Sequence, residues 1–496
     1  MNFSTIDYII VVVYLIGVAL FGIFISGKQK SVSDYFLGER NIPWWAACFS
    51  IVATETSTLT FLSIPGVAYL TNLGFLQLAC GFLIGRIIVA IIFIPKYYAG
   101  NLETAYQFLG NRFGNPMRKY SSITFILLRI FADGVRLFTT AIPIKLLTGF
   151  GYFETILIVG VITVIYSYIG GIKAVIWTDV VQMFIYFIGA IASIIVIYNL
   201  LPNGFADVTA FAADANKLQI FNFAFAGSFG EFFTGNYNAI GGLIGGAFLA
   251  MASHGTDQII VQRLLVCKDK TASQKALIGS GILVLFQFAL FLIIGVMLFA
   301  FFKGVDYTTL MVDGHLLTKP DEIFAKFIIE NLPVGLAGLV IAGLLAASMS
   351  TLSSTFNSLA STTILDLFKF KEKGITQEKE LRYSRLATLF WAFIVIGTAM
   401  LFLDETNPAV AYALSIQSVI YGGLLGVFLL GMAWKNASLT DAVVSYSIAI
   451  LVLILLFVLP KFDLIPAVNF TWFTLAGVII VFIISGFSMS LRKIFK

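Results

Sequence analysis

Apolar residues form long continuous runs along this chain, separated by shorter polar segments. Thirteen runs follow one another, and most approach the ~20 residues that an α-helix needs to cross about 30 Å of hydrocarbon. The strands of a membrane β-barrel would instead alternate apolar and polar residues over about ten positions. The pattern therefore predicts an all-α, multi-pass membrane protein with 13 transmembrane helices. We place them at residues 5–26, 43–69, 73–99, 119–149, 152–170, 175–200, 240–263, 273–303, 333–366, 382–403, 409–432, 438–460 and 470–490.

The first run is interpreted as a helix rather than as a cleaved signal peptide. The MNFSTID that precedes it carries no positive charge. The apolar run that begins at Tyr8 is too long for a signal peptide and lacks an A-x-A-like exit.

Composition and charge agree with a protein of the bilayer. Of 496 residues, 59% are hydrophobic and 11% are charged, against roughly half and about a quarter in soluble domains. The net charge of +5 does not indicate nucleic-acid binding, because 22 of the 31 Lys and Arg lie in alternate loops and the carboxy tail, and five in the other loops. The positive-inside rule places the amino terminus outside and the carboxy terminus in the cytoplasm. We expect a monomer in the plasma (inner) membrane.

Two segments place helix-weakening residues in the middle of apolar spans. ATETSTLT, residues 53–60, holds five hydroxyl side chains and one carboxylate, and SMSTLSSTFNS, residues 348–358, has Ser or Thr at six of the eight positions from 348 to 355. Such hydroxyls often bond their own helix backbone or a neighbouring helix. Their density here favours a second interpretation, an ion site.

A sodium ion requires several oxygen ligands, which membrane helices supply from unwound carbonyls or from side chains on one face. A helix break at 53–56 would free such carbonyls. Four residues of the second segment have i, i+3, i+4, i+7 spacing and share one helix face: Ala347, Ser350, Thr351 and Ser354. The sequence predicts that the two segments meet at a sodium site.

Asp179, in VIWTDVVQ, is a lone carboxylate within a predicted span, where an ionised group costs several kcal/mol unless it is neutralised. A bound cation would neutralise it. Alternatively, Asp179 caps a helix or pairs with Lys173 near the cytoplasmic surface. Both interpretations stay open from the sequence.

A second set of charges lies within the spans: Glu55, Arg86, Arg129, Asp133 and Arg136. Arg129 and Asp133 are four residues apart, and Asp133 and Arg136 are three apart, so these three side chains can neutralise one another along one helix face. In the alternative interpretation, one arginine holds a substrate carboxylate in a fork geometry, and Glu55 meets a hydroxyl, an amine or a cation.

His254, in ASHGTDQIIVQR, is either structural or a proton carrier. Asp257 and Arg263, which follow it, are assigned to the cytoplasmic mouth. The run GGLIGGA, residues 241–247, predicts close helix packing rather than a phosphate loop, because no Lys followed by Ser or Thr comes after it.

Four stretches resemble the sodium/solute symporter family, which includes sugar, sialic acid, proline and monocarboxylate transporters. They are SDYFLGERNIPWWAACFSIVATETS (33–57), GGIKAVIWTDVVQ (170–182), TDQIIVQRLLVCKD (256–269) and AASMSTLSSTFNS (346–358). The resemblance covers nearly the whole chain.

The resemblance implies a LeuT-like fold of inverted five-helix repeats. A leading helix and cytoplasmic loop would occupy residues 1–42, the first repeat 43–200, an external loop 201–239, the second repeat 240–432, and two trailing helices with a cytoplasmic tail 433–496.

The family motifs also imply ion sites. One sodium ion would be held by the carbonyls of Ala53, Thr56 and Ala347 and the hydroxyls of Ser350 and Thr351. A second, found in part of the family, would use Asp179, Ser350, Ser353 and Ser354. We therefore expect two sodium ions per cycle as coupling ions, and no other cofactor.

The substrate is predicted only as a class. TDQIIVQR resembles the sugar branch, Glu55 with Ser350 and Thr351 is similar to the proline branch, and SIPGVAY (63–69) resembles the sialic acid branch, which has a substrate-contacting glutamine where this chain has Ala79. We expect a small polar solute with a carboxylate or several hydroxyls. Its candidate ligands are Glu55, Ser57, Thr60, Phe75, Asp133, Arg136 and Gln417.

Other functional classes fit the sequence less well. A sodium channel would show a continuous polar stripe along several helices, and a membrane-embedded enzyme would show paired carboxylates with metal spacing or a nucleophile with its base; neither pattern is present. The alternative that stays open is a proton-coupled solute symporter on the same scaffold, with Glu55, Asp179 or His254 as the proton relay.

Overall fold

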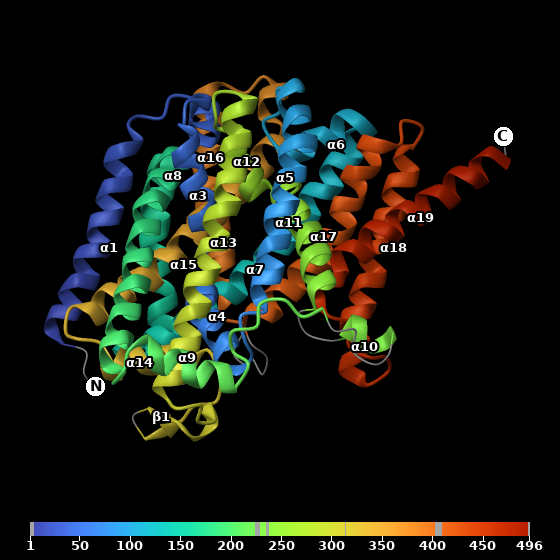
Figure 1. Ribbon diagram of the computed structural model, residues 1–496. Coiled ribbons are helices and arrows are strands. Elements are labelled where there is room, and N and C mark those ends of the chain that lie inside the picture. The colour runs from blue at the N-terminus through green and yellow to red at the C-terminus, as the bar shows by residue number, and fades with distance from the viewer. Residues whose placement is uncertain (1–3, 224–228, 235–237, 313, 402–408, 495–496) are drawn as a thin grey trace.

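The computed structural model describes residues 4–223, 229–234, 238–312, 314–401 and 409–494. Most of the chain forms long helices that run side by side, and α1 begins at the end of the bundle opposite the one where α19 finishes (Figure 1). The elements of the first half are α1 (Thr5–Ser26), α2 (Val32–Leu37), η1 (Gly38–Arg40), α3 (Trp44–Glu55), α4 (Thr58–Leu70), α5 (Phe75–Ala99), α6 (Ala105–Phe113), α7 (Asn115–Thr148), α8 (Tyr152–Leu200), α9 (Phe205–Asp214) and α10 (Phe229–Thr234).

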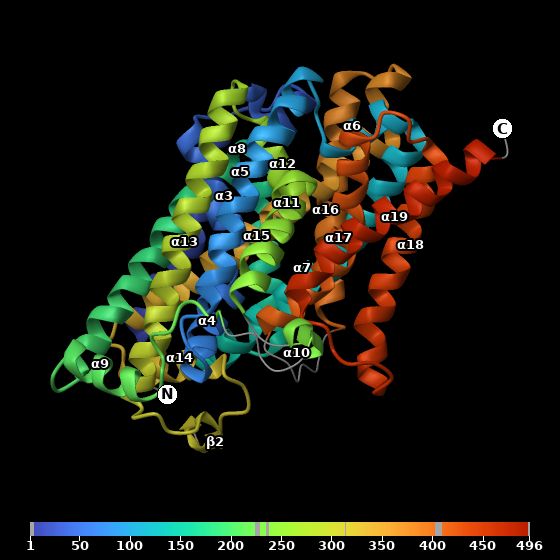
Figure 2. The same ribbon diagram turned by 45° about the vertical axis from the view of Figure 1, so that its right-hand side comes forward.

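The second half continues the bundle and adds a two-stranded antiparallel hairpin. Helices α18 and α19 lie at the edge of the bundle (Figure 2). The elements are η2 (Gly241–Gly245), α11 (Gly246–Gly255), α12 (Gln258–Leu265), α13 (Lys270–Phe301), η3 (Tyr307–Thr309), β1 (Met311–Val312), β2 (His315–Leu316), α14 (Glu322–Asn331), α15 (Leu336–Ser361), η4 (Thr362–Phe368), η5 (Phe370–Lys373), α16 (Gln377–Ala399), α17 (Ala409–Ala433), α18 (Leu439–Val458), η6 (Leu459–Phe462), η7 (Phe470–Trp472) and α19 (Phe473–Ile494).

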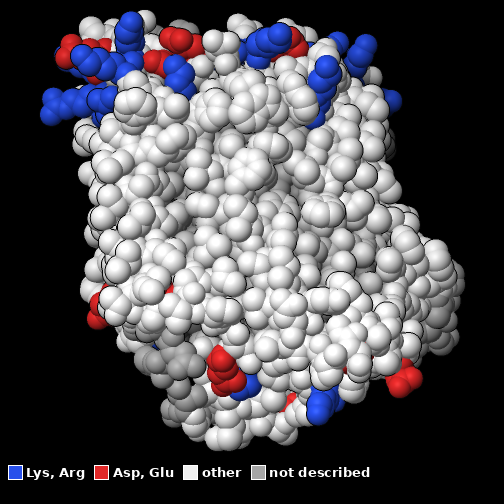
Figure 3. Space-filling view, turned by 60° about the vertical axis from the view of Figure 1, so that its left-hand side comes forward, with Lys and Arg blue, Asp and Glu red and all other residues white. Residues whose placement is uncertain are grey.

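The outer surface of the bundle is apolar. Figure 3 shows an uncharged belt between two charged rims, with most of the visible Lys and Arg at the upper rim. Large side chains such as Phe24 and Phe393 are 86% and 76% exposed, which is favourable against lipid tails and costly against water. Among the described residues, seven helices are long and apolar enough to cross a membrane, or eight if one bent pair counts as a single span. The chain is an all-helical membrane-spanning protein.

Each of the 13 predicted spans overlaps helix in the structure. The number of membrane crossings and the inverted-repeat layout stay predictions. Spans 152–170 and 175–200 lie in α8, on either side of a kink at Gly171. The φ of Gly171 is +54°, in the region that favours glycine. A Cβ there would lie 2.4 Å from the Tyr35 carbonyl oxygen, so both backbone conformation and space require glycine.

The predicted break in the second span is present. Helix α3 ends at Glu55, Thr56 is extended with ψ of 111°, and Ser57 begins α4 as its N-cap. The two halves of the span meet at an angle of 60°. The final turn of α3 therefore leaves carbonyls without helix partners inside the protein.

Helix α15 forms the interior of the bundle, where both views place it (Figures 1 and 2). Every residue from 340 to 364 is buried. Because the SMSTLSSTFNS segment lies in this stretch, its hydroxyls face other helices rather than lipid, and they need polar partners there.

The connections that follow α8 and α13 hold short helices, among them α9 and α14. Lys217, which follows α9, donates to the Tyr69 carbonyl at 2.6 Å and lies 4.2 Å from the centre of the Phe299 ring. Burial lowers the pKa of this ammonium. These contacts attach the segment after α9 to α4 and α13.

Candidate functional site

The two polar segments predicted to meet are in direct contact. The Thr351 hydroxyl on α15 donates to the Thr54 carbonyl at 3.1 Å, in the last turn of α3. The Thr58 hydroxyl, just after the break, donates to the Leu344 carbonyl at 3.2 Å. The break in the second span therefore packs against the middle of α15.

The residues predicted for the first sodium ion lie at this contact. All five are buried, with at most 3% of any one exposed: Ala53, Thr56, Ala347, Ser350 and Thr351. Carbonyls at the end of α3 and hydroxyls on α15 supply the buried, oxygen-rich surroundings that suit a hard cation. The Ser350 hydroxyl also donates to Asp179 Oδ1 at 2.7 Å, so this set adjoins the second one.

Asp179 lies in the middle of a charged cluster rather than at a helix end. Its Oδ2 accepts from Ser50 Oγ at 2.5 Å and from the Arg263 guanidinium at 3.0 Å. Arg263 also donates to Ser354, and Ser353 Oγ donates to the Ser350 carbonyl at 3.0 Å. The four residues predicted to bind a second ion therefore lie close together. The Arg263 guanidinium also neutralises the Asp179 carboxylate.

The alternative in which Asp179 pairs with Lys173 was wrong, because Lys173 Nζ contacts Asp34 at 2.6 Å instead. Arg263, which the sequence assigned to the cytoplasmic mouth, is fully buried and pairs with Asp179. Ser50 and Arg263 lie 129 and 84 residues from Asp179 in the chain, so local spacing gave no signal that either would reach this carboxylate.

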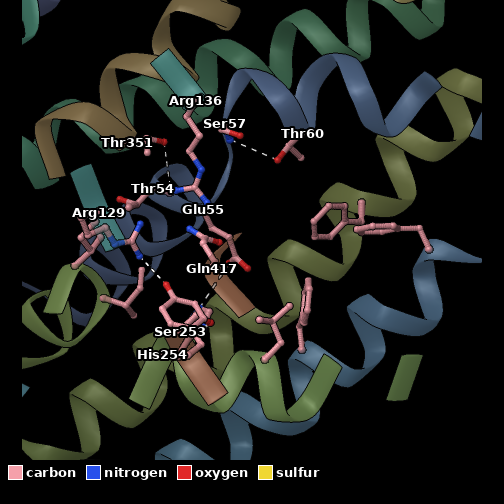
Figure 4. Close-up of a pocket in the computed structure, with 17 residues that line it drawn as sticks. Thr54, Glu55, Ser57, Thr60, Arg129, Arg136, Ser253, His254, Thr351 and Gln417 are labelled. Carbon is pink, nitrogen blue, oxygen red and sulfur yellow. Dashed lines mark hydrogen bonds and ion pairs between the residues drawn. The ribbon is translucent and has the colours of Figure 1, made fainter. Parts of the chain in front are cut away.

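A cavity opens beside the break in the second span (Figure 4). Six of the seven predicted substrate ligands line it: Glu55, Ser57, Thr60, Phe75, Arg136 and Gln417. The other lining residues include three outside the predicted set of ligands: Arg129, Ser253 and His254. The cavity thus combines aromatic walls with hydroxyl, carboxylate and guanidinium groups, as ligand pockets commonly do.

Asp133, the seventh predicted ligand, does not line the cavity and lies behind Arg136. Its Oδ1 accepts from Arg136 at 2.9 Å and from Arg129 at 3.5 Å, and its Oδ2 accepts from Thr355 on α15 at 2.6 Å. The predicted contacts along α7 are present. Asp133 is therefore placed to orient Arg136 rather than to contact a solute.

Arg129 has its closest partners on other helices. It donates to the Asp257 carboxylate and to Tyr421 Oη, the latter at 2.7 Å, and Tyr421 in turn donates to Asp257 at 2.6 Å. Asp257 is fully buried, as the N-cap of α12. Because Arg129 is engaged in this way, Arg136 is the lining guanidinium with the greater freedom to bind a solute.

Glu55 and Arg86 form a salt bridge beside the cavity. Arg86 is fully buried on α5, and its other terminal nitrogen donates to Ser280 Oγ at 2.9 Å. The Glu55 side chain is 23% exposed and lies 3.7 Å from His254 Nε2. Arg86 therefore neutralises Glu55 while the carboxylate still faces the cavity.

Comparison with known proteins identifies the family. The model of the sodium:solute symporter family matches residues 35–449. The chain belongs to the sodium:solute symporter family. It is a sodium-coupled symporter of the membrane, a transporter rather than an enzyme, and sodium is its coupling ion.

Its relatives include symporters of sialic acid. The chain is 30% identical to the sodium/sialic acid symporter NanT of Aliivibrio fischeri, over 99% of this chain and 94% of NanT. It is 28% identical to the sodium/sialic acid symporter SiaT of Proteus mirabilis, over 91% and 89% of the two chains. A solved structure of a Na⁺-coupled sialic acid symporter, in its substrate-bound outward-open state, superposes with a TM-score of 0.87 and 26% identity over 99% of this chain and 98% of that one.

Proposed function

We propose that this symporter imports a small anionic solute of the sugar-acid type, by alternating access and with two sodium ions per cycle. The observation that carries the proposal is the cavity in which Arg136 and Glu55 lie together beside the broken span. A guanidinium binds a carboxylate in a fork geometry, and the Glu55 carboxylate accepts hydrogen bonds from hydroxyls. A solute that carries a carboxylate and hydroxyls can therefore bind Arg136 and Glu55 at the same time.

Two features of this chain favour a substrate other than sialic acid itself. The resemblance to the sialic acid branch implies a substrate-contacting glutamine at the position of Ala79, and Glu55 adds a carboxylate to the cavity wall. The relatives named for sialic acid support an acidic sugar as the class. The proposed substrate is therefore a hydroxylated carboxylate within that class, with its exact identity open to a screen.

The proposed ion sites follow from the contact between α3 and α15. The first ion would bind carbonyls of Ala53, Thr56 and Ala347 with the hydroxyls of Ser350 and Thr351. The second would use Asp179 with Ser350, Ser353 and Ser354, approaching Oδ1 because Arg263 and Ser50 bond Oδ2. The amino terminus is proposed to lie outside the cell, because Lys and Arg concentrate in the loops assigned to the cytoplasm. Figure 3 shows most of the visible Lys and Arg at one rim of the molecule.

A binding experiment tests the proposal. Purified protein is melted in sodium or choline chloride, with N-acetylneuraminate, D-glucuronate, D-gluconate, proline, galactose and lactate as probes. We expect sodium to raise the melting temperature, and an acidic sugar to raise it further only in sodium. Ligand at a hundredfold excess over Kd stabilises the folded state by roughly 2.7 kcal/mol.

Variants on α15 separate the ion site from general destabilisation. Ser350→Ala should abolish the response to sodium. Ser361→Ala, a buried serine on the same helix whose hydroxyl bonds only the Ser358 carbonyl among the contacts described, should retain it. Normal sodium-driven uptake by Ser350→Ala would overturn the ion assignment, and uptake that persists without sodium at acidic pH would favour proton coupling.

A further inference from the structure

His254 belongs to the cavity wall, and one of its ring nitrogens lacks a hydrogen bond in the described part of the chain. The side chain lies on α11, is 2% exposed and lines the cavity. Its Nε2 is buried and has no hydrogen-bond partner among the described residues. The nearest charged group, Glu55 Oε2, is 3.7 Å away, beyond the range of a direct hydrogen bond.

The other ring nitrogen indicates which tautomer is present. Nδ1 lies 3.2 Å from the Ala250 carbonyl oxygen and 2.8 Å from Ser253 Oγ. A carbonyl oxygen only accepts hydrogen bonds, so a bare Nδ1 would place two acceptors against each other. On this contact the proton is assigned to Nδ1, which makes Nε2 of the neutral ring an acceptor.

A second proton on the ring is disfavoured by the charges around it. Glu55 is already neutralised by Arg86, so an imidazolium would add an unpaired charge to a buried site. The remaining charged groups of the cavity wall are also engaged: Arg129 with Asp257, and Arg136 with Asp133. His254 Nε2 and Glu55 are consequently two acceptors that face one another across 3.7 Å.

We propose that His254 is a specificity-determining residue whose Nε2, together with the Glu55 carboxylate, accepts hydrogen bonds from substrate hydroxyls. A donor placed between two acceptors removes the cost of a buried, unsatisfied nitrogen. Arg136 and His254 enter the pocket from opposite sides, with Glu55 between them (Figure 4). The inference rests on the proposed function, since it assigns the hydroxyl-bearing end of a solute whose carboxylate Arg136 holds.

The test compares probes with and without hydroxyls. D-Gluconate and hexanoate have six carbons and one carboxylate each, but hexanoate has no hydroxyl. Binding of both in saturating sodium is measured for wild type, His254→Phe and His254→Gln. His254→Phe should weaken gluconate binding about 10- to 100-fold, as expected when buried polar groups lose their partner, and should leave hexanoate binding unchanged. His254→Gln, whose amide oxygen is an acceptor, should recover most of the gluconate affinity.

Each outcome decides one question. Sodium-dependent stabilisation of wild type by an acidic sugar tests the proposed function, whatever His254 does. An equal loss for both probes in His254→Phe, or no loss for gluconate, overturns the role of His254. A wild-type gluconate affinity that rises as the pH falls from 8 to 5.5, with the rise absent in His254→Gln, also overturns it, because the ring would then bind as an imidazolium. Melting temperatures in sodium alone show whether each variant is folded.

Discussion

Asp133 illustrates how one carboxylate can link separate parts of the site. It has no exposed surface, and its two oxygens accept from Arg136 and Arg129 on α7 and from Thr355 on α15. Thr355 lies one helical turn from Thr351, a proposed sodium ligand. Movement of the Arg136 guanidinium is thereby tied to the helix that carries the proposed ion site.

Asp133→Asn tests this positioning role. The amide keeps the size of the side chain but removes the charge, so Arg136 loses its ion pair and becomes less well oriented. Hydrogen bonds to charged groups contribute about 1.5–3 kcal/mol, which corresponds to a loss of roughly 10- to 150-fold in affinity for a carboxylate substrate. We expect KM or Kd for an acidic sugar to rise by this factor while the sodium-induced rise in melting temperature remains.

Asp366→Asn is the matched control. Asp366 is also fully buried, and it accepts from Arg118 at 2.7 Å and from Thr104 at 2.6 Å, but it is not part of the cavity lining described above. Both variants should lose thermal stability, and only Asp133→Asn should lose substrate affinity. Equal substrate affinity in the two variants would contradict the role of Asp133.

At the scale of elements, the contact of α5 with η2 and α11 positions His254 of the cavity wall and Arg86 beside it. These elements approach through small residues, as GGLIGGA predicted. A Cβ on Gly85 would lie 2.3 Å from the Ala247 carbonyl oxygen, and one on Gly81 would lie 2.5 Å from that of Gly242. Arg86 and His254 project from these two closely packed helices, so their separation depends on this contact.

Gly85→Ala should therefore damage both stability and binding. The added methyl group meets the backbone of α11, and such overpacking typically costs 1–3 kcal/mol. We expect a lower melting temperature in detergent and weaker binding of an acidic sugar. Gly397→Ala on α16 is the control, because a Cβ there meets nothing within 4 Å and alanine favours the helix. A Gly85→Ala protein as stable as Gly397→Ala would show that the helices can separate without cost.

At the scale of the molecule, the buried charges of the site balance. Four arginines in or beside the site each have a carboxylate partner: Arg86 with Glu55, Arg129 with Asp257, Arg136 with Asp133 and Arg263 with Asp179. These groups thus add no net charge to the site. Two sodium ions and one monoanion would carry one net positive charge inward, whereas one ion and one monoanion would carry none.

Coupling to the membrane potential consequently tests the stoichiometry. One charge moving across 100 mV contributes about 2.3 kcal/mol, so the steady-state accumulation of an acidic sugar in proteoliposomes should rise about fiftyfold per 100 mV, inside negative. The measurement uses potassium gradients with valinomycin at a fixed sodium gradient. Accumulation that does not respond to potential would contradict two ions per cycle.

A double variant tests whether Asp179 binds the second sodium ion. Asp179→Asn alone would leave Arg263 buried without its carboxylate, which is strongly destabilising. Asp179→Asn with Arg263→Gln removes both charges and keeps side chains of similar size. We expect this variant to retain sodium-dependent uptake and to lose the dependence of accumulation on potential.

The sequence by itself determined the features that depend on neighbouring residues. Long apolar runs predicted where helices lie because the thickness of the bilayer fixes their length. Polar residues in residues 53–60 predicted the break at Thr56, and the spacing of Arg129, Asp133 and Arg136 predicted their contacts, because helix periodicity is local. Six of the seven residues predicted as substrate ligands line the cavity.

Only the tertiary structure decided which distant groups meet. Arg263 reaches Asp179 across 84 residues, Arg86 reaches Glu55 across 31, and Arg129 reaches Asp257 across 128. The role proposed for the acceptor nitrogen of His254 likewise depends on Glu55, which lies on another helix. Each of these contacts depends on how far a helix is rotated and shifted against its neighbours, and that is set by the packing of whole helix faces rather than by any short pattern in the chain.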